Sequence, residues 1–298
     1  MAKPFSENSF LKKLFPLLPT GKNVIVPAGD DCAVIEVGGK LLALSVDQLI
    51  ENRHYLPESG PFKAGRKLLT RNLSDLAAMG AQPLYALISS ATGPDKDEEW
   101  LEEFHRGILS AAKIYNVLIL GGDLAVTPND TLASLTIIGE LEKKPILRSG
   151  ALAGHSIYVT GEFGNSFLSE HHLNFEPRIH EGQWLAEHAS AMIDITDGVL
   201  TDLLRVSAAS GVGAVLFPEQ VPARDQASIK QRMCDGEDYE LLFAIDQKDE
   251  KKLEKDWPFS CSLTKIGNFC AEIDPGKAVD KEGTDLTQIY GLGFDHFQ

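Results

Sequence analysis

The sequence has few cysteines, few basic residues and no long apolar run, and each shortage excludes a class of protein. Its 298 residues include four cysteines, none in a CxxC pair or at zinc-ligand spacing, which indicates reduced thiols rather than a disulfide scaffold or a zinc module. Apolar runs such as Val117–Leu120 are far shorter than a membrane span. The first residues lack the apolar stretch of a signal peptide, so we expect a cytoplasmic protein.

Positive charge is also scarce. Lysine and arginine number 28 against 43 acidic residues, a net charge of −15, and the pI is about 4.9. Without a basic excess to meet a phosphate backbone, we expect neither nucleic acid nor an anionic membrane as a partner. Small phosphate ligands remain possible, because carboxylates bind phosphates through metal ions.

The common nucleotide-binding and hydrolase motifs are absent as well. The chain has no GxxxxGK[ST] loop, no GxGxxG between a strand and a helix, no protein-kinase motifs and no GxSxG. Gly211-Val212-Gly213 lies where a helix ends and a strand begins, the wrong polarity for a phosphate-binding turn. A nucleotide site would therefore have to be built from other residues.

The length predicts two domains, and turn-forming residues around 145–154 place the boundary so that the domains are residues 1–147 and 148–298. Strands and helices alternate irregularly in both halves, and Gly38-Gly39 indicates a hairpin. This pattern favours an α+β or mixed α/β fold over a doubly wound parallel sheet. We predict strands at 24–26, 33–37, 41–46, 84–90, 117–120, 132–141, 156–160, 192–195, 213–217, 239–245 and 263–267, and helices at 64–81, 97–115, 181–190 and 198–210.

The most informative feature is the position of the aspartates. Several follow or end predicted strands, among glycines and apolar residues, as in Gly29-Asp30-Asp31, Ser45-Val46-Asp47, Gly121-Gly122-Asp123, Ile193-Asp194-Ile195-Thr196-Asp197 and Asp235-Gly236-Glu237-Asp238. Asp75 lies at the edge of the apolar stripe of a predicted helix, where an unpaired carboxylate would be very costly.

Each of these acids alone has a structural interpretation as a turn or helix-capping residue. Caps do not account for Asp194 inside an apolar strand or for Asp75, and too few lysines and arginines lie nearby in the sequence to pair them all. We therefore expect the carboxylates to converge on more than one Mg²⁺, a hard cation that binds oxygen ligands and phosphates. Such a site suits phosphoryl transfer.

The same segments give the chain a resemblance to a known family. It resembles the thiamine-monophosphate kinases, part of the ATP-binding superfamily that includes aminoimidazole ribonucleotide synthetase, selenophosphate synthetase and a hydrogenase-maturation protein. The matching stretches keep the family order over nearly the whole chain: GDDCAVI (29–35), SVDQLIENRHY (45–55), NLSDLAAMGAQPLYAL (72–87), GGD (121–123), IIGE (137–140), RSGALAGHSIYVTGEFGNS (148–166), IDITDGVLTDLLRVSAASGVGA (193–214), GEDYELLFAI (236–245) and GFDHF (293–297).

The resemblance implies a transfer of phosphate from ATP to thiamine monophosphate, giving ADP and thiamine diphosphate, in a two-domain, aminoimidazole ribonucleotide synthetase-like fold. It implies a homodimer with the N-terminal sheets at the interface and ATP near it. The roles that it implies are Mg²⁺ binding by Asp30, Ser45, Asp47, Asp75, Asp123, Asp194 and Asp197, ATP binding by Asp123, Arg148 and Thr196, and thiamine monophosphate binding by His54, Glu237 and Phe294.

No general base is expected, because the attacking phosphate oxygen is already ionised near pH 7. The pair His171-His172 is interpreted as a loop rather than a metal site, since adjacent residues do not share a face. Val46 and Leu124 replace hydroxyl residues that the family often has. Two alternatives stay open: a related ATP-dependent enzyme with another acceptor, and a nucleotide-binding module without catalysis.

Overall fold

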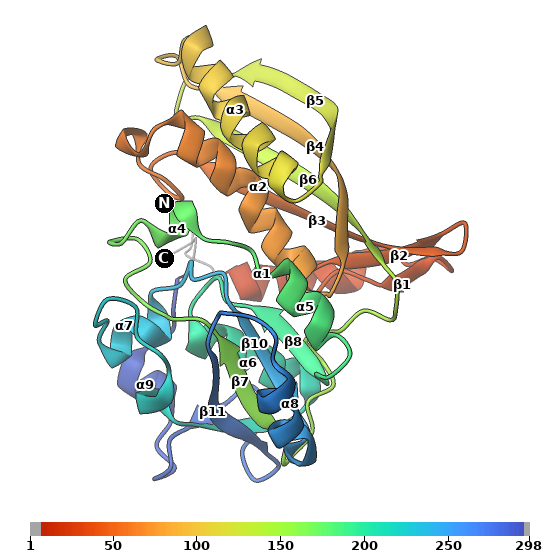
Figure 1. The fold of residues 1–298 in the computed structure, drawn as a ribbon, viewed down its shortest axis with the longest axis vertical. Coiled ribbons are helices and arrows are strands. Elements are labelled where there is room, and N and C mark those ends of the chain that lie inside the picture. Colours follow the sequence, from red (N-terminus) through yellow and green to blue (C-terminus); the bar gives the residue numbers. More distant parts are fainter. Residues whose placement is uncertain (1–6, 295–298) are drawn as a thin grey trace.

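Two six-stranded sheets, one from each half of the chain, form the frame of the molecule (Figure 1). The computed structural model describes residues 7–294. The first half contains α1 (Glu7–Leu14), β1 (Val24–Val26), β2 (Ala33–Val37), β3 (Lys40–Ile50), α2 (Pro61–Ala78), β4 (Gln82–Thr92), α3 (Glu98–Ile114), β5 (Leu118–Val126) and β6 (Leu132–Leu141). The second contains β7 (Ser156–Thr160), α4 (His171–Asn174), α5 (Ile179–Leu185), β8 (Ala191–Asp194), α6 (Val199–Ser210), β9 (Gly213–Leu216), α7 (Ile229–Cys234), β10 (Leu241–Ile245), α8 (Glu250–Asp256), β11 (Leu263–Cys270), β12 (Ala278–Val279) and α9 (Leu286–Tyr290).

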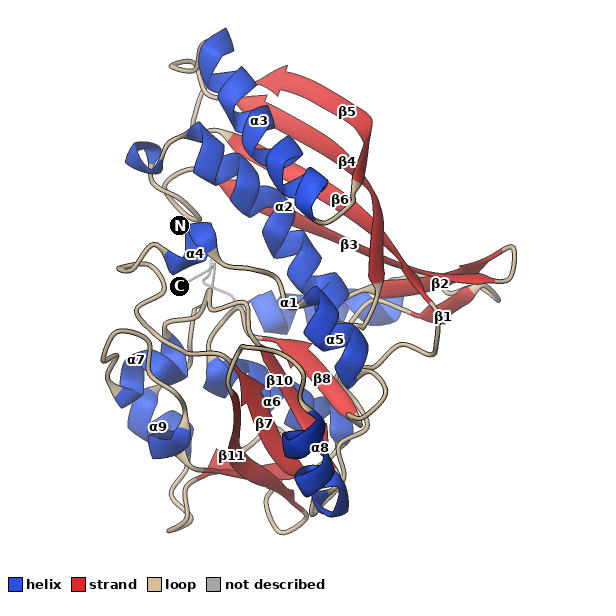
Figure 2. Cartoon of the chain, in the orientation of Figure 1, coloured by secondary structure: helices blue, strands red, loops and turns tan. Residues whose placement is uncertain are grey.

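The first sheet has the order β1-β2-β3-β6-β4-β5 and is covered by helices on one face only. Figure 2 shows α2 and α3 lying across that face. Along β6, buried and partly exposed residues alternate through all ten positions, which is the period of a strand with one covered and one open face. The register aligns Val46 of β3 with Thr136 of β6 and Leu87 of β4, so these three side chains share the open face.

The second sheet has the order β12-β9-β11-β7-β10-β8 and is buried on both faces. In β10, Leu241, Phe243 and Ile245 join the core that the second sheet shares with the first unit. The alternate residues Leu242 and Ala244 join a separate core beneath α6. The continuous apolar run of this strand follows from burial on both sides.

Helix α2 connects the two units, because it packs on the first sheet and α3 and also contacts α4, α5 and β8. Glycines permit the close approaches. A Cβ on Gly65 would lie 1.9 Å from the carbonyl oxygen of Phe104 in α3, and one on Gly182 of α5 would lie 2.0 Å from that of Ala77. Because α2 is covered by both units, even polar residues such as Lys67, Asn72 and Ser74 are buried.

The fold confirms the predicted mixed α/β architecture with two units. The predicted strands and longer helices are present with ends shifted by up to six residues; the largest shift extends β5 to Val126, so that Asp123 lies inside this strand and not after it. Gly211 is the left-handed C-cap of α6. The loop interpretation of His171-His172 is wrong, because both residues belong to the one-turn helix α4. Within residues 7–294 there is no helix with the length and apolar character to span a membrane.

Candidate active site

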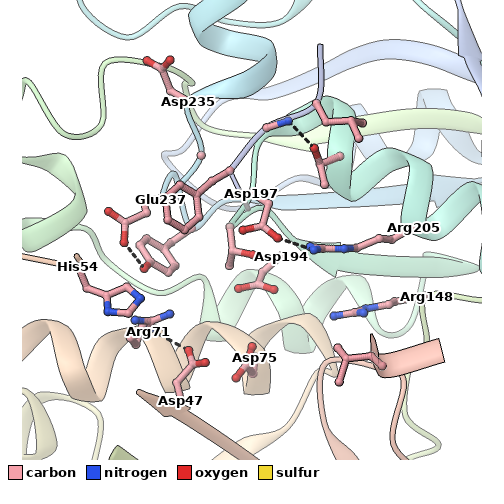
Figure 3. Close-up of a pocket in the computed structure, with 18 of the residues that line it drawn as sticks. Asp47, His54, Arg71, Asp75, Arg148, Asp194, Asp197, Arg205, Asp235 and Glu237 are labelled. Atoms are coloured by element: carbon pink, nitrogen blue, oxygen red, sulfur yellow. Dashed lines mark hydrogen bonds and ion pairs between the residues drawn. The ribbon is translucent and has the colours of Figure 1, made fainter. Parts of the chain in front are cut away.

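A cavity of about 930 Å³ lies between the two units (Figure 3). Most of the residues singled out in the sequence line it, although they come from seven separate segments: Asp30, Asp47, His54, Asp75, Arg148, Asp194, Thr196, Asp197, Glu237 and Phe294. Ser45 lies behind this wall, where its hydroxyl donates to Asp75 Oδ2 at 2.5 Å. The last three residues of the terminal GFDHF motif, 295–297, lie outside the described residues.

Three carboxylates meet at one end of the cavity, two of them on its wall and the third, Asp31, buried beside them. Asp31, Asp75 and Asp194 each offer an oxygen, and the three oxygens lie within 4.8 Å of one another. Burial, followed by the charges of neighbouring aspartates, raises the pKa of Asp75 and Asp194 well above its usual value. The hydroxyls of Ser45 and Ser74 donate to Asp75 and Asp194 and orient them.

This triad has the donor set of a divalent-cation site. All of its ligands are oxygens, as Mg²⁺ prefers. Asp31 Oδ2 is buried and makes no hydrogen bond among residues 7–294, an acceptor that a cation would satisfy. Asp31 was not among the predicted ligands. Its neighbour Asp30 also lines the cavity, and its pKa is raised to about 6 by burial and by Asp31.

Arginines pair with some of these acids, but among residues 7–294 Asp30, Asp75 and Asp194 form no ion pair with a lysine or arginine, so the basic residues do not pair them all. Arg71 Nε donates to Asp47 Oδ2 at 2.9 Å, and Arg148 Nη2 donates to Asp31 Oδ1 at 2.6 Å.

Arg205 pairs with Asp197 and, through Nη1, with Asp202 Oδ1 at 2.5 Å. Asp202 Oδ2 also accepts the backbone N–H groups of Thr196 and Asp197 at 3.0 Å, which fixes the turn before α6. Arg71 in α2 and Arg148 in the segment joining the units are 24 and 117 residues from their partners, so sequence distance hides these two pairs. Arg205 in α6 is only three and eight residues from Asp202 and Asp197.

A second network surrounds Glu237 at the other end of the cavity. The buried Lys67 donates to Glu237 Oε1 at 2.7 Å, to the carbonyl oxygen of His54 at 2.6 Å and to His172 Nδ1 at 2.9 Å, which uses all three ammonium protons. Burial would raise the pKa of Glu237, but Lys67 and its other cationic neighbours lower it to about 2. Glu237 is therefore a fixed negative charge on the cavity wall.

Aromatic side chains stand beside this carboxylate. Tyr239 is buried behind Glu237, its hydroxyl 3.4 Å from Oε1, and it stacks on Phe175 with ring centroids 3.9 Å apart. Phe294 lines the cavity, and its backbone N–H donates to the carbonyl oxygen of Asp197 at 3.2 Å. An anion and aromatic faces together form a pocket suited to an aromatic cation.

Apart from Ser45, which lies behind the wall, Asp123 is the predicted site residue that does not line the cavity. It lies on β5, paired with Ser89 of β4, and its side chain is exposed on the first sheet. The two family departures also lie off the cavity: Val46 is exposed on the open face of the sheet, and Leu124 is exposed near the start of α3.

The site residues that sequence reasoning missed are Asp31, Lys67, Arg71, Ser74, Arg205 and Asp202. One signal was present in the sequence. Lys67 and Arg71 precede Asp75 by eight and four residues, which puts all three on one side of the helix. The remaining contacts depend on the packing of the two units.

Two family models and several known proteins match this chain. The family model for the AIR synthase related protein N-terminal domain matches residues 29–141, and that for the C-terminal domain matches residues 117–257. A thiamine-monophosphate kinase from Salmonella typhimurium is 34% identical, with 90% of this chain and 91% of the relative covered. The Escherichia coli thiamine-monophosphate kinase is 33% identical, with 98% of both chains covered.

Solved structures show the same likeness. The complex of AaThiL with AMPPCP and TMP superposes with a TM-score of 0.84 at 26% identity, covering 98% of this chain and 97% of the other. Thiamine-monophosphate kinase from Stenotrophomonas maltophilia has a TM-score of 0.74 at 25% identity, covering 91% and 94%. The hydrogenase maturation protein HypE shares the fold, with a TM-score of 0.70 at 17% identity and coverage of 98% and 95%.

Proposed function

This chain belongs to the thiamine-monophosphate kinase family, and on that basis we propose that it transfers the γ-phosphoryl group of ATP to thiamine monophosphate, giving thiamine diphosphate and ADP. The observation that carries the proposal is a single cavity with a carboxylate triad at one end and an anionic, aromatic pocket at the other. The first end suits metal-bound phosphates, and the second suits the cationic ring of the acceptor.

Mg²⁺ ions belong to this proposal, and the triad supplies oxygen ligands for them. Asp31, Asp75 and Asp194 would hold one ion, and the other cavity aspartates predicted as ligands, Asp30, Asp47 and Asp197, would complete further coordination. When bound, the ions screen the repulsion between two anionic reactants, which is roughly 4 kcal/mol per pair of unit charges at about 4 Å and an effective dielectric constant of 20. Arg148 and Thr196 would contact the ATP phosphates.

No residue of the cavity needs to act as a general base. His54 Nδ1 accepts the backbone N–H of Ile50 at 2.8 Å, so in the neutral ring Nε2 carries the proton and can only donate. The acceptor phosphate supplies an ionised oxygen of its own. What the chain contributes is alignment: the acceptor is held by Glu237, His54 and Phe294 so that its phosphate attacks the γ-phosphorus in line.

A homodimer through the first sheet is also part of the proposal. The open face of that sheet exposes Val46 of β3, Leu87 of β4 and Leu118 of β5. Leu118 pairs with Tyr85, two residues before Leu87 on the same strand. A second copy packed there would cover these apolar side chains. Asp123 lies on this sheet and away from the cavity of its own chain, so its proposed role in metal and ATP binding depends on such a partner.

The boundary between the two units is proposed at 147/148, in the segment between β6 and β7. Arg148 lies directly at this point and contacts Asp30 and Asp31 of the first unit. The geometry of the phosphate site would therefore depend on how the two units are placed relative to each other.

The test is direct. Purified protein is incubated with ATP, MgCl₂ and thiamine monophosphate, and products are separated by chromatography; EDTA and other acceptors serve as controls. Thiamine diphosphate formed only with divalent metal supports the proposal, and ATP chiral at the γ-phosphorus should give inverted product. Activity on another acceptor alone would point to a related enzyme. Burial and nearby Asp75 raise the pKa of the Cys32 thiol well above its usual value, which disfavours a reactive-cysteine enzyme.

A further inference from the structure

Helix α2 presents three charged side chains at four-residue intervals to the cavity region. Lys67, Arg71 and Asp75 therefore lie on one side of the helix, about 6 Å apart along its axis. Lys67 holds Glu237 at the aromatic end, and Asp75 belongs to the carboxylate triad at the other end. Arg71 lies between the two, on the wall of the cavity (Figure 3).

Two of the five guanidinium N–H groups of Arg71 are used by the protein. Nε donates to Asp47 Oδ2 at 2.9 Å, and Nη1 donates to the carbonyl oxygen of Gln48 at 2.5 Å. Among residues 7–294, Nη2 makes no hydrogen bond. The side chain is only 11% exposed, so a mostly buried cationic fork keeps donors available beside the cavity. Asp47 compensates the buried charge, and the remaining N–H groups are left to donate to a further anion.

The proposed reaction supplies an anion at this place. The ring of thiamine monophosphate would lie at Glu237 and Phe294, and its phosphate must extend toward the triad at Asp75. A molecule that spans these two ends passes Arg71, which lies between Lys67 and Asp75 on the helix. We propose that Arg71 binds the phosphate of the acceptor, an inference that rests on the proposed function.

In this arrangement Arg71 does two things. Its planar fork donates to two oxygens of the acceptor phosphate and so fixes the direction of the third, attacking oxygen. Its charge also reduces the repulsion between the two phosphate groups. Anchoring by Asp47 and Gln48 holds the guanidinium still, which limits the entropy lost when the phosphate binds.

The experiment compares two ligands that differ only in the phosphate. Isothermal titration with MgCl₂ and AMPPCP present measures the affinity of thiamine monophosphate and of thiamine for the wild type, Arg71→Gln and Arg71→Lys. Arg106→Gln, a change on the exposed face of α3, is the matched control. We expect Arg71→Gln to lose at least tenfold in affinity for thiamine monophosphate and less than twofold for thiamine, with Arg71→Lys in between and the control unchanged.

Thiamine affinity also reports whether the variant site is folded. An equal loss for both ligands would mean that Arg71 only supports the structure, and an unchanged preference for the phosphorylated ligand would mean that another group binds the phosphate. AMPPCP itself is titrated separately into each variant with MgCl₂, and a loss confined to AMPPCP would assign Arg71 to the donor. Each of these outcomes overturns the inference. A wild type that binds AMPPCP but neither thiamine compound would instead reject the proposed function itself.

Discussion

The substitution Asp75→Asn tests the carboxylate triad most directly, because it should move stability and activity in opposite directions. Asparagine keeps the shape of the side chain and can still accept the Ser45 hydroxyl through its amide oxygen. What it removes is one negative charge beside Asp194 and Asp31. Without metal this charge only repels its neighbours, whereas a bound metal ion would use it as a ligand.

The size of the effect follows from the geometry. Two unit charges 4.8 Å apart, the upper limit within the triad, repel by ~3.5 kcal/mol at an effective dielectric constant of 20. Shorter separations would increase this repulsion, whereas the raised pKa of Asp75 reduces it, because partial protonation removes part of the charge. A group whose folded pKa is raised contributes stability at low pH that is lost as pH rises through that pKa. The metal-free wild type should therefore lose this contribution on going from acid to neutral pH, and Asp75→Asn should not.

The assay is thermal unfolding at pH 7.5 with EDTA and then with MgCl₂, alongside turnover. In EDTA we expect Asp75→Asn to unfold a few degrees above the wild type, since about 1 kcal/mol shifts the midpoint of a large domain by about 2–4 °C. Metal at a hundred times its Kd adds about 2.7 kcal/mol to the wild type. The variant should lose most of that gain and at least ~1,000-fold in kcat. A variant that is less stable in EDTA, or that keeps the full metal-dependent shift, would refute the triad as a cation site.

Three further predictions follow from particular contacts. Burial lowers the pKa of Lys67 from 10.5 to about 8, so this ammonium group loses its proton as the pH rises through about 8. The Lys67–Glu237 ion pair is then lost, and kcat/KM for thiamine monophosphate should fall above pH 8. A pH profile that stays flat to pH 9.5 would contradict a role for this pair. Leu87→Glu on the open face of the first sheet should convert a dimer to a monomer in light scattering, while Leu152→Glu, an exposed leucine outside both sheets, should not; a dimer that survives Leu87→Glu places the interface elsewhere. Gly65→Ala should cost at least ~2 kcal/mol in the free energy of unfolding, because the new Cβ would lie 1.9 Å from the Phe104 carbonyl oxygen, whereas Gly21→Ala, with no atom within 4 Å, should be neutral in the same denaturant titration.

The regular elements were predictable where one physical pattern dominated. The Gly38-Gly39 turn and its alternating flanks determine the β2–β3 hairpin, and a long apolar stripe determines α2 and α3. The short elements α1, α4, α7, α8, α9 and β12 were not predicted. A helix of one or two turns carries too few apolar residues to show a period, and its existence depends on packing that the sequence alone does not reveal.

The anions of the site were predictable and its cations were not, for the same physical reason. An aspartate such as Asp194 inside an apolar strand is conspicuous, because burying a carboxylate requires compensation. Lysine and arginine on a helix are ordinary, because most lie on a solvated face. Lys67 and Arg71 depart from that rule only because α2 lies between the two units, and Arg148 reaches Asp31 only because the segment joining the units passes beside the first sheet.

This difference changes the electrostatic argument for the site. From the sequence alone we would expect a strongly negative cavity, in which phosphates could bind only through metal ions. In the structure Arg71, Arg148 and Arg205 each already pair with a cavity aspartate or its neighbour. A divalent ion that binds one of these aspartates weakens its ion pair with the arginine. The arginine can then attract a phosphate group more strongly. Metal and phosphate should therefore bind cooperatively, because each ligand satisfies the partner that the other one leaves.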